Sequence, residues 1–182
     1  MRAFLSIGSN LGNRLELLRE AVRGLIAAGD IRLVEASRLY ETEPWEAKPG
    51  RLPDRSDWFL NCVVAIETTL PPRTLLERVQ AVETALGRTR PPGQTPEARR
   101  FSPRPLDIDI LLYEEQVLSV SDDLHIPHLF LHERGFVLRP LAELAPEIVH
   151  PTLYRAIREL AAELQDAHEV RLADLPPEWF ER

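Results

Sequence analysis

Two aspartates, Asp107 and Asp109, stand two residues apart inside the apolar run from Leu106 to Tyr113. Because a β-strand alternates its side chains between two faces, both carboxylates would project side by side from one face. The other face would enter a core with Leu106, Ile108, Ile110 and Leu112. Mg²⁺ prefers oxygen ligands, and two metal ions held ~3.5 to 4 Å apart can bind the attacking and leaving oxygens of one displacement. The pair therefore predicts a magnesium site.

The segment before this pair is basic, although the chain as a whole is acidic. Residues 88–104 contain five arginines and one glutamate, a local charge of +4, whereas the 182 residues together carry a formal net charge of −7. The arginines are Arg88, Arg90, Arg99, Arg100 and Arg104. An isolated Asp-x-Asp is most often a solvated strand edge. Guanidinium groups bind phosphate oxygens, so the cluster instead favours a site where a polyphosphate binds together with Mg²⁺.

A flat acceptor molecule would need aromatic faces and a group that reads polar edges. Phe59 and Asn61 supply a ring and an amide on one side of a predicted strand, and Trp45 and Phe136 could stack from other sides. Aromatic residues near a strand belong more often to a core than to a ligand site. These four residues are therefore a hypothesis about an acceptor pocket.

Other chemistries find no matching motif in the chain. There is no G-x-x-x-x-G-K-[ST] segment, and residues 8–13 lack the spacing of a dinucleotide fingerprint. His128 and His132 are four residues apart, but the glutamate of an H-E-x-x-H zinc motif is missing. Cys62, the only cysteine, lies in an apolar run and reads as a buried inert thiol. Phosphoryl-type transfer by positioning and charge neutralisation is what remains.

Length and composition predict the class of protein that holds these groups. A chain of 182 residues with 44% hydrophobic and 28% charged residues is typical of one compact domain. The acidic balance argues against a nucleic-acid partner. The start of the chain is too short an apolar segment for a signal peptide, and no stretch of ~18 uncharged residues predicts a membrane span. We therefore expect a cytoplasmic protein with no membrane partner.

Hydrophobic periodicity predicts the elements that position the site. Strands are expected over 2–7, 31–40, 58–68 and 106–113, and helices over 11–26 and 72–86, ending near Gly29 and Gly87. We expect Ser9 or Asn10 to cap the first helix, Pro140 to end or kink a later one, and a further helix from Thr152. Residues 169–172 read as extended. The order β-α-β-β-α-β predicts an α+β, ferredoxin-like fold with an antiparallel sheet backed by helices.

With these residues assembled, the chain resembles the 6-hydroxymethyl-7,8-dihydropterin pyrophosphokinase family. The family motifs occur in order over about residues 3 to 150, in segments 7–12, 40–44, 59–61, 104–110 and 127–136. The most diagnostic is Arg-Pro-Leu-Asp-Ile-Asp-Ile at 104–110. The resemblance implies an αβα sandwich and an ATP- and Mg-dependent diphosphokinase. Such an enzyme transfers pyrophosphate from ATP to the hydroxymethyl group of 6-hydroxymethyl-7,8-dihydropterin in folate biosynthesis and releases AMP.

The resemblance also assigns roles to residues. Two Mg²⁺ ions are expected on Asp107 and Asp109, bound together with ATP, and Arg88 and Arg104 join these aspartates as catalytic residues. The nucleotide side is expected to comprise Gln80, Glu83, Arg88, Arg104, Ile110, His128 and Arg134. The pterin side is expected to comprise Thr42, Pro44, Trp45, Phe59, Asn61 and Phe136. A monomer is expected, with the pterin pyrophosphokinase domain over 1–164 and an appendage of the same domain over 165–182.

Some positions depart from the family pattern, and two rival functions stay open. Phe101 stands where a tryptophan is common, Leu129 where a tyrosine can occur, and residues 91–96 are extra. Which of Arg90, Arg99 and Arg100 contacts phosphate is therefore not assigned. The rivals are a Mg-nucleotide sensor without chemistry and a metal-dependent nucleotidyltransferase, which would release pyrophosphate instead of AMP.

Overall fold

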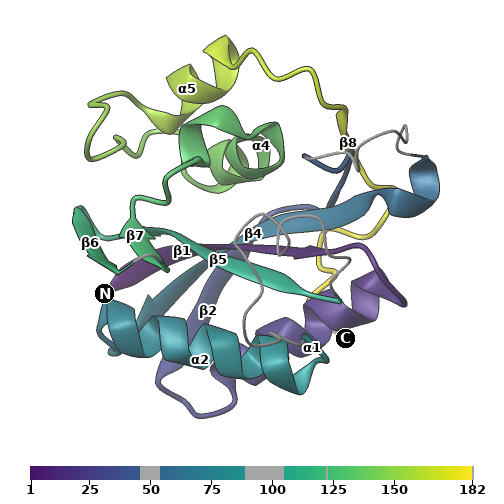
Figure 1. Ribbon diagram of the computed structural model, residues 1–182, viewed down its shortest axis with the longest axis horizontal. Helices are drawn as coiled ribbons and strands as arrows, with labels where there is room; N and C mark the ends of the chain where they lie inside the picture. The colour runs from purple at the N-terminus through teal and green to yellow at the C-terminus, as the bar shows by residue number, and fades with distance from the viewer. Residues whose placement is uncertain (46–53, 89–104, 122, 182) are drawn as a thin grey trace.

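The computed structural model describes residues 1–45, 54–88, 105–121 and 123–181. In these residues, an antiparallel sheet whose strands differ in length lies between two helical layers (Figure 1). The sheet has the order β5-β1-β4-β3-β8, with β2 also paired to β4. Its strands are β1 (Arg2–Ser9), β2 (Ile31–Ala36), β3 (Tyr40–Thr42), β4 (Phe59–Thr68), β5 (Asp107–Tyr113) and β8 (Val170–Leu172). This arrangement confirms the α+β, ferredoxin-like fold expected from the order of elements.

Helices cover both faces of the sheet (Figure 1). Helices α1 (Arg14–Ile26) and α2 (Pro72–Ala85) lie on one face, and α4 (Gly135–Leu144) and α5 (Ile157–Glu163) lie on the other. Smaller elements complete the description: the 3₁₀ turns η1 (Arg55–Asp57) and η2 (Leu131–Glu133), and a hairpin of β6 (Leu118–Ser121) and β7 (Leu124–Ile126). The hairpin was not expected from the sequence.

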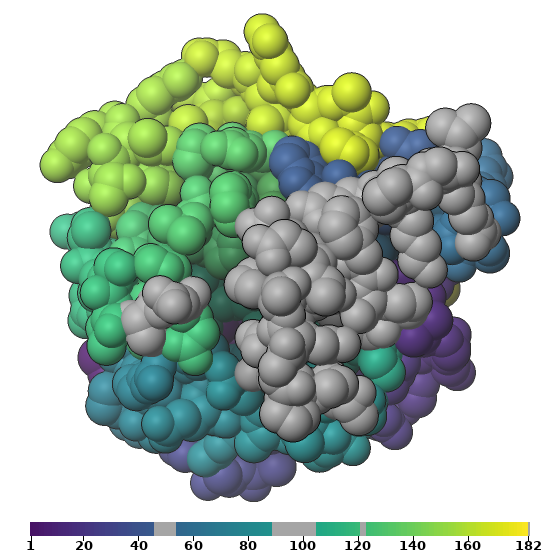
Figure 2. Space-filling model, in the orientation of Figure 1, coloured from purple at the N-terminus to yellow at the C-terminus, as the bar shows by residue number. Residues whose placement is uncertain are grey.

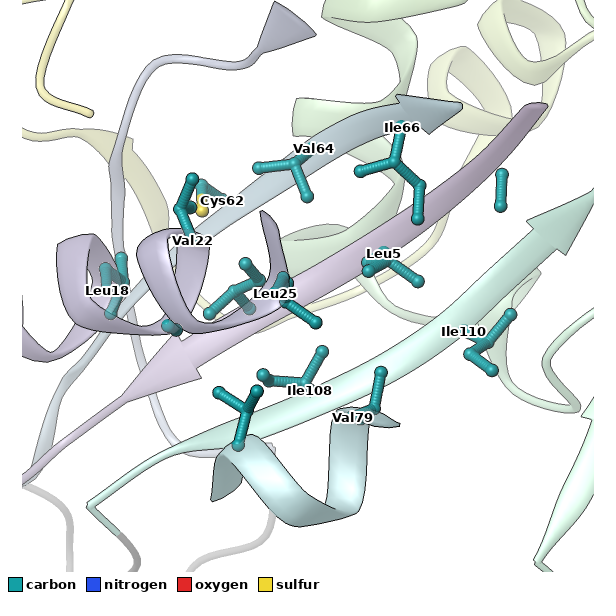
Figure 3. Packing of buried hydrophobic residues seen from close by; sticks show 14 of the residues in the cluster. Leu5, Leu18, Val22, Leu25, Cys62, Val64, Ile66, Val79, Ile108 and Ile110 are labelled. Carbon is teal, nitrogen blue, oxygen red and sulfur yellow. The ribbon is translucent and has the colours of Figure 1, made fainter. Parts of the chain in front are cut away.

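Alternation along the strands builds a separate core on each face. On β4, Cys62, Val64 and Ile66 pack toward α1 and α2, whereas Val63 and Ala65 pack toward α4 and α5. Figure 3 shows the first of these cores, where side chains of β1, β4 and β5 meet those of the two helices. Cys62 is fully buried in this core, as expected, and burial raises the pKa of its thiol.

Two strand predictions need correction. The single strand expected over 31–40 is two strands, because Ser37 interrupts the ladder: its hydroxyl accepts a hydrogen bond from Val63 N at 3.0 Å. The second correction concerns Leu112. The register of β1 and β5 shifts between Phe4 and Leu5, so that Leu112 packs on the α4 face rather than beside Ile110.

Three helix predictions were also wrong in detail. Helix α1 is capped by Asn13, whose side chain accepts from Glu16 N at 3.3 Å, and not by Ser9 or Asn10. Helix α4 does not end at Pro140, so the first of the two outcomes expected there is wrong: the helix continues to Leu144 with the proline inside it. No helix begins at Thr152: a turn closed by the bridge between Val149 and Ala156 precedes α5.

The segment after residue 164 packs along the sheet edge and into the core. Strand β8 pairs with β3, which confirms the expected extended segment, and Trp179 is fully buried. The Trp179 indole N–H donates to Ser37 O at 2.9 Å, while Arg19 Nε donates to Trp179 O at 2.6 Å. The boundary at 164/165 stays a prediction. In the part of the chain that is described, no helix has the length and apolar character needed to cross a membrane.

Candidate active site

Gly8, Thr42 and Asn61 form a buried unit where β4 pairs with β1 on one side and with β3 on the other. Register places Gly8 opposite Asn61 and Tyr40 opposite Asn61 on its other side. The Asn61 amide is 4% exposed, and its Nδ2 donates to Thr42 Oγ1 at 2.7 Å. A Cβ on Gly8 would lie 2.2 Å from Asn61 Oδ1, so only glycine leaves room for this amide. The unit holds a carboxamide at a fixed position beside the pocket described below.

Aromatic rings form the walls around this amide. Trp45 and Phe136 meet edge to face with ring centroids 6.2 Å apart. The Arg134 guanidinium lies over both rings, 5.7 Å from the Trp45 centroid and 5.6 Å from that of Phe136. Phe59 begins β4, two residues before Asn61 on the same face. A flat ring with a polar edge could stack between these walls and bond the amide.

The two aspartates reach the same pocket from β5. Asp107 pairs with Gly8 and Asp109 with Ser6, so both carboxylates lie on the face that carries Asn61. Enclosure in the pocket and the neighbouring charge of Asp107 raise the pKa of Asp109. His128 Nε2 lies 3.9 Å from Asp109 Oδ2, and burial lowers the pKa of His128 despite the attraction of that carboxylate. Two crowded carboxylates repel each other, and a divalent cation between them would relieve that repulsion.

Arg88 joins helix α2 to the aspartate strand. Its Nη1 lies 2.5 Å from Asp107 Oδ1 and also bonds the carboxylate of Glu83. Glu83 is fully buried and accepts a further hydrogen bond from Ile108 N at 2.8 Å. The charges of Asp107 and Glu83 outweigh burial and raise the pKa of Arg88. Arg88 is thus a cation held beside the carboxylate pair.

One pocket brings most of the predicted residues together. Its lining comprises Ser6, Gly8, Thr42, Glu43, Pro44, Trp45, Phe59, Asn61, Asp107, Asp109, Arg134 and Phe136. All six residues expected on the pterin side are among them, together with both aspartates and Arg134. Sequence reasoning missed Ser6, Gly8 and Glu43 as site residues. Gly8 was visible as a glycine that directly follows an apolar strand segment, but its role depends on the register with Asn61.

The other predicted residues lie outside this lining. Ile110 is 5% exposed in the core toward α1 and α2, and Gln80 is half-buried on α2. His128 adjoins Asp109, as described above. Arg104, like Arg90, Arg99 and Arg100, lies outside the described residues.

The described residues contain no group of three or more His, Cys, Asp or Glu side chains arranged to hold a metal ion. A carboxylate pair still fits Mg²⁺, which often takes only one or two carboxylates and completes its shell with substrate phosphates and water.

Comparison with known proteins supports the family resemblance that the sequence motifs indicate. Residues 4–146 match the family described as 7,8-dihydro-6-hydroxymethylpterin-pyrophosphokinase (HPPK). A Methylorubrum extorquens protein named 2-amino-4-hydroxy-6-hydroxymethyldihydropteridine pyrophosphokinase is 46% identical over 149 residues, covering 81% of this chain and 85% of that protein. A Haemophilus influenzae protein of the same name is 35% identical over 170 residues, covering 93% of this chain and 97% of that protein.

Solved structures share the fold. A Plasmodium falciparum HPPK-DHPS structure, wild type with pteroate, superposes with a TM-score of 0.66 at 16% identity, covering 89% of this chain and 42% of that one. This chain therefore spans less than half of that solved chain, and at such identity the likeness shows the fold alone. Because the family match extends over residues 4–146 and two relatives above 30% identity are covered over 85% and 97% of their lengths, the chain belongs to the HPPK family.

Proposed function

We propose that this protein transfers pyrophosphate from ATP to the hydroxymethyl group of 6-hydroxymethyl-7,8-dihydropterin and releases AMP, a step of folate biosynthesis. The observation that carries the proposal is the single pocket in which the aromatic walls, the Asn61 amide and both aspartates meet. A heterocycle held between the rings would have its substituent near the carboxylate pair. The family match and the names of the relatives support the same reaction.

The pterin half of the pocket combines stacking with a fixed amide. Trp45, Phe59 and Phe136 would contact the faces of the ring, and Thr42 and Pro44 would complete the wall. Asn61 Oδ1 accepts and Nδ2 donates, the pairing that a pterin edge offers, and the bond from Nδ2 to Thr42 fixes the orientation of the amide. Recognition through a buried amide also disfavours rings that lack the matching edge.

The nucleotide half is built from charge. Asp107 and Asp109 are the residues that would hold two Mg²⁺ ions bound with ATP. When bound, Mg²⁺ would neutralise the triphosphate and polarise its phosphorus centres. Arg88 lies against Asp107, and Arg134 lines the pocket that both aspartates reach, so these two guanidinium groups are the ones we propose for the phosphate oxygens. Gln80, Glu83, Arg104, Ile110 and His128 complete the proposed nucleotide side.

The reaction requires positioning rather than a covalent enzyme intermediate. The hydroxymethyl oxygen forms a bond to the β-phosphorus as the bond between that phosphorus and the oxygen bridging to the α-phosphate breaks. AMP keeps the bridging oxygen, the pterin gains the diphosphate, and one proton is released. Arg88 and Arg104 would stabilise charge on the transferred group, and comparable cationic groups contribute ~10³ to 10⁵ in rate in phosphoryl transfer.

Product identification tests the proposal. Incubation with ATP, Mg²⁺ and 6-hydroxymethyl-7,8-dihydropterin should give AMP and the pterin diphosphate in equal amounts. Release of pyrophosphate would instead assign a nucleotidyltransferase, and nucleotide binding without turnover would assign a sensor. Asp109→Ala should keep its circular dichroism spectrum and lose turnover by about a hundredfold or more. Asp174→Ala, which removes an exposed carboxylate outside the pocket, is the matched control and should turn over normally. Near-normal turnover by Asp109→Ala would remove the metal assignment.

Two further features belong to this proposal. We propose that the enzyme acts as a monomer in the cytoplasm, with the pterin pyrophosphokinase domain over 1–164 and its appendage over 165–182. Sedimentation of the full chain with and without ATP tests whether the protein is a monomer, and a stable dimer would contradict this proposal.

A further inference from the structure

The segment after residue 164 contacts the pterin pocket as well as the sheet edge. Strand β8 pairs with β3 in the register that sets Thr42 opposite Val170. The pairing continues past β3: Glu43 N donates to Glu169 O at 3.0 Å, and Glu169 N donates to Glu43 Oε2 at 2.8 Å. Figure 2 shows the C-terminal segment in yellow beside the blue residues of the β3 region. Two residues beyond this link on one side lies Trp45, and one residue before it on the other lies His168.

His168 stacks on Trp45. The two ring centroids are 4.8 Å apart with an interplanar angle of 32°, closer than the 6.2 Å that separates Trp45 from Phe136. Trp45 therefore has Phe136 and Arg134 on its pocket side and His168 as a third support. Displacement of the indole would therefore alter its contact with the His168 ring.

Asp166 fixes the imidazole. The Nδ1 of His168 lies 2.6 Å from Asp166 Oδ1, and His168 N donates to the same oxygen at 3.0 Å. The Asp166 side chain is only 4% exposed, so the bond operates in a shielded environment. Burial alone would raise the pKa of Asp166, but the bonds from His168 and Gly135 outweigh it and lower that pKa. The carboxylate is thus a charged acceptor that orients His168.

The same carboxylate holds the other aromatic wall. Asp166 Oδ2 accepts from Gly135 N at 2.8 Å, at the first residue of α4 and next to Phe136. A Cβ on Gly135 would lie 2.9 Å from this oxygen, so a glycine permits the close approach. One buried side chain therefore sets both the start of the helix that carries Phe136 and the ring that supports Trp45.

We propose that His168, held by Asp166, is a positioning residue that fixes Trp45 as a wall of the pterin pocket, so that the segment after residue 164 helps to determine pterin binding. This inference rests on the proposed function for the identity of the ligand. It adds residues that lie beyond the family match, which ends at residue 146. His168 does not line the pocket, so it acts through Trp45 and not on the substrate.

Steady-state kinetics of His168→Ala in the full-length chain tests the proposal. Loss of the stacking partner should raise KM for the pterin by about three- to tenfold, because the interaction energy of an aromatic pair corresponds to a factor of that size. The kcat should stay within about twofold and KM for ATP should not change, since the carboxylates are untouched. His168→Phe restores a ring against Trp45 and should recover most of the lost affinity.

A matched control and an activity-independent readout separate this inference from the proposed function. His125→Ala removes an imidazole that bonds Ser119 on the β6–β7 hairpin, outside the pocket, and should leave all constants unchanged. Tryptophan emission should differ between wild type and His168→Ala, and the difference should vanish when both carry Trp45→Phe, since Trp58 and Trp179 are unaffected.

The outcomes are distinguishable. If wild type forms no pterin diphosphate, the proposed function fails, while the emission cycle still reports the contact between His168 and Trp45. If the emission difference persists without Trp45, the proposed support does not exist. If His168→Ala leaves KM for the pterin within twofold of wild type, or raises KM for ATP equally, the segment does not set pterin binding and the inference is overturned.

Discussion

Gly8 shows how one missing side chain can define a substrate site. Asn61 presents its amide to the pocket only because the residue opposite it on β1 has no Cβ. The hydrogen bond from its Nδ2 to Thr42 on β3 restrains rotation of the amide. Three strands thus meet at a single carboxamide, and hydrogen-bonding specificity for a ring edge depends on its position to within a fraction of an ångström.

Gly8→Ala should therefore impair pterin binding without unfolding the protein. The new Cβ would have to displace Asn61 Oδ1, so we expect KM for the pterin to rise by about tenfold or more, with circular dichroism unchanged. The control is Gly24→Ala in helix α1, away from the pocket: its Cβ would lie 3.3 Å from Val82, so it adds a tight contact elsewhere and should keep the wild-type KM. An unchanged KM in Gly8→Ala would mean that Asn61 does not contact the ring.

At the scale of single residues, the sequence predicted which side chains could do chemistry better than it predicted which side chains they contact. The spacing of Asp107 and Asp109 was enough to place both on one face, and the six residues that the motif resemblance predicted for the pterin side all line the pocket. Ser6 could not be found in this way, because it enters the pocket through the register that pairs it with Asp109, whereas Glu43 directly follows β3 between the predicted residues Thr42 and Pro44. The contact of His168 with Trp45 likewise depends on the pairing of β3 with β8, which joins segments more than a hundred residues apart.

Among the elements, the contact between α2 and β5 decides where the aspartates lie. Glu83 projects from the helix to the start of the strand and accepts the N–H of Ile108, the residue between Asp107 and Asp109. Its second partner is Arg88, which also bonds Asp107. Glu83, which we expect on the nucleotide side, therefore also fixes where Asp107 and Asp109 lie relative to α2.

Glu83→Ala should destabilise the fold by about 2 kcal/mol, because it leaves the buried Ile108 N–H without its acceptor. Urea unfolding followed by circular dichroism measures this free energy. Glu77→Ala, at an exposed position of the same helix, should change it by less than about 0.5 kcal/mol. Equal effects of the two substitutions would show that the Glu83 contact does not hold α2 to β5.

Periodicity predicted the type and order of most elements but not their interruptions. The break between β2 and β3 depends on a serine hydroxyl that takes the place of a ladder group. The displacement of Leu112 depends on a bulge at Leu111 of β5, which sets Leu112 opposite Phe4 and Ile110 opposite Leu5, and the apolar run itself does not report this bulge. The β6–β7 hairpin has short strands and no strong alternation.

At the scale of the whole molecule, hydrogen bonds to charged side chains link layers whose relative position hydrophobic contacts alone would not fix. Glu143 on α4 is one example: it accepts from the Tyr40 hydroxyl at 2.6 Å and from Arg38 N at 3.0 Å. Burial opposes its ionised form, but these hydrogen bonds lower the pKa of Glu143. Burial and the same carboxylate raise the pKa of Tyr40 to about 12.

This link should make stability depend on pH in a defined direction. Because the pKa of Glu143 is lower folded than unfolded, its contribution is complete above its unfolded value of about 4.3 and is lost as the pH falls through the folded value. We expect Glu143→Gln to be less stable than wild type by about 1 kcal/mol at pH 7. Urea titrations from pH 7 to pH 3 should show the difference narrowing below about pH 4. A constant difference would contradict the lowered pKa.

The position of β1 in the sheet has a consequence for biosynthesis. This strand is made before both of its hydrogen-bonded neighbours: β4 begins at Phe59 and β5 at Asp107. At ribosomal speeds of about 5 to 20 residues per second, an apolar ribbon with two open edges waits several seconds for its first partner. During that interval nascent-chain chaperones would shield it, and crowding during overexpression should favour inclusion bodies.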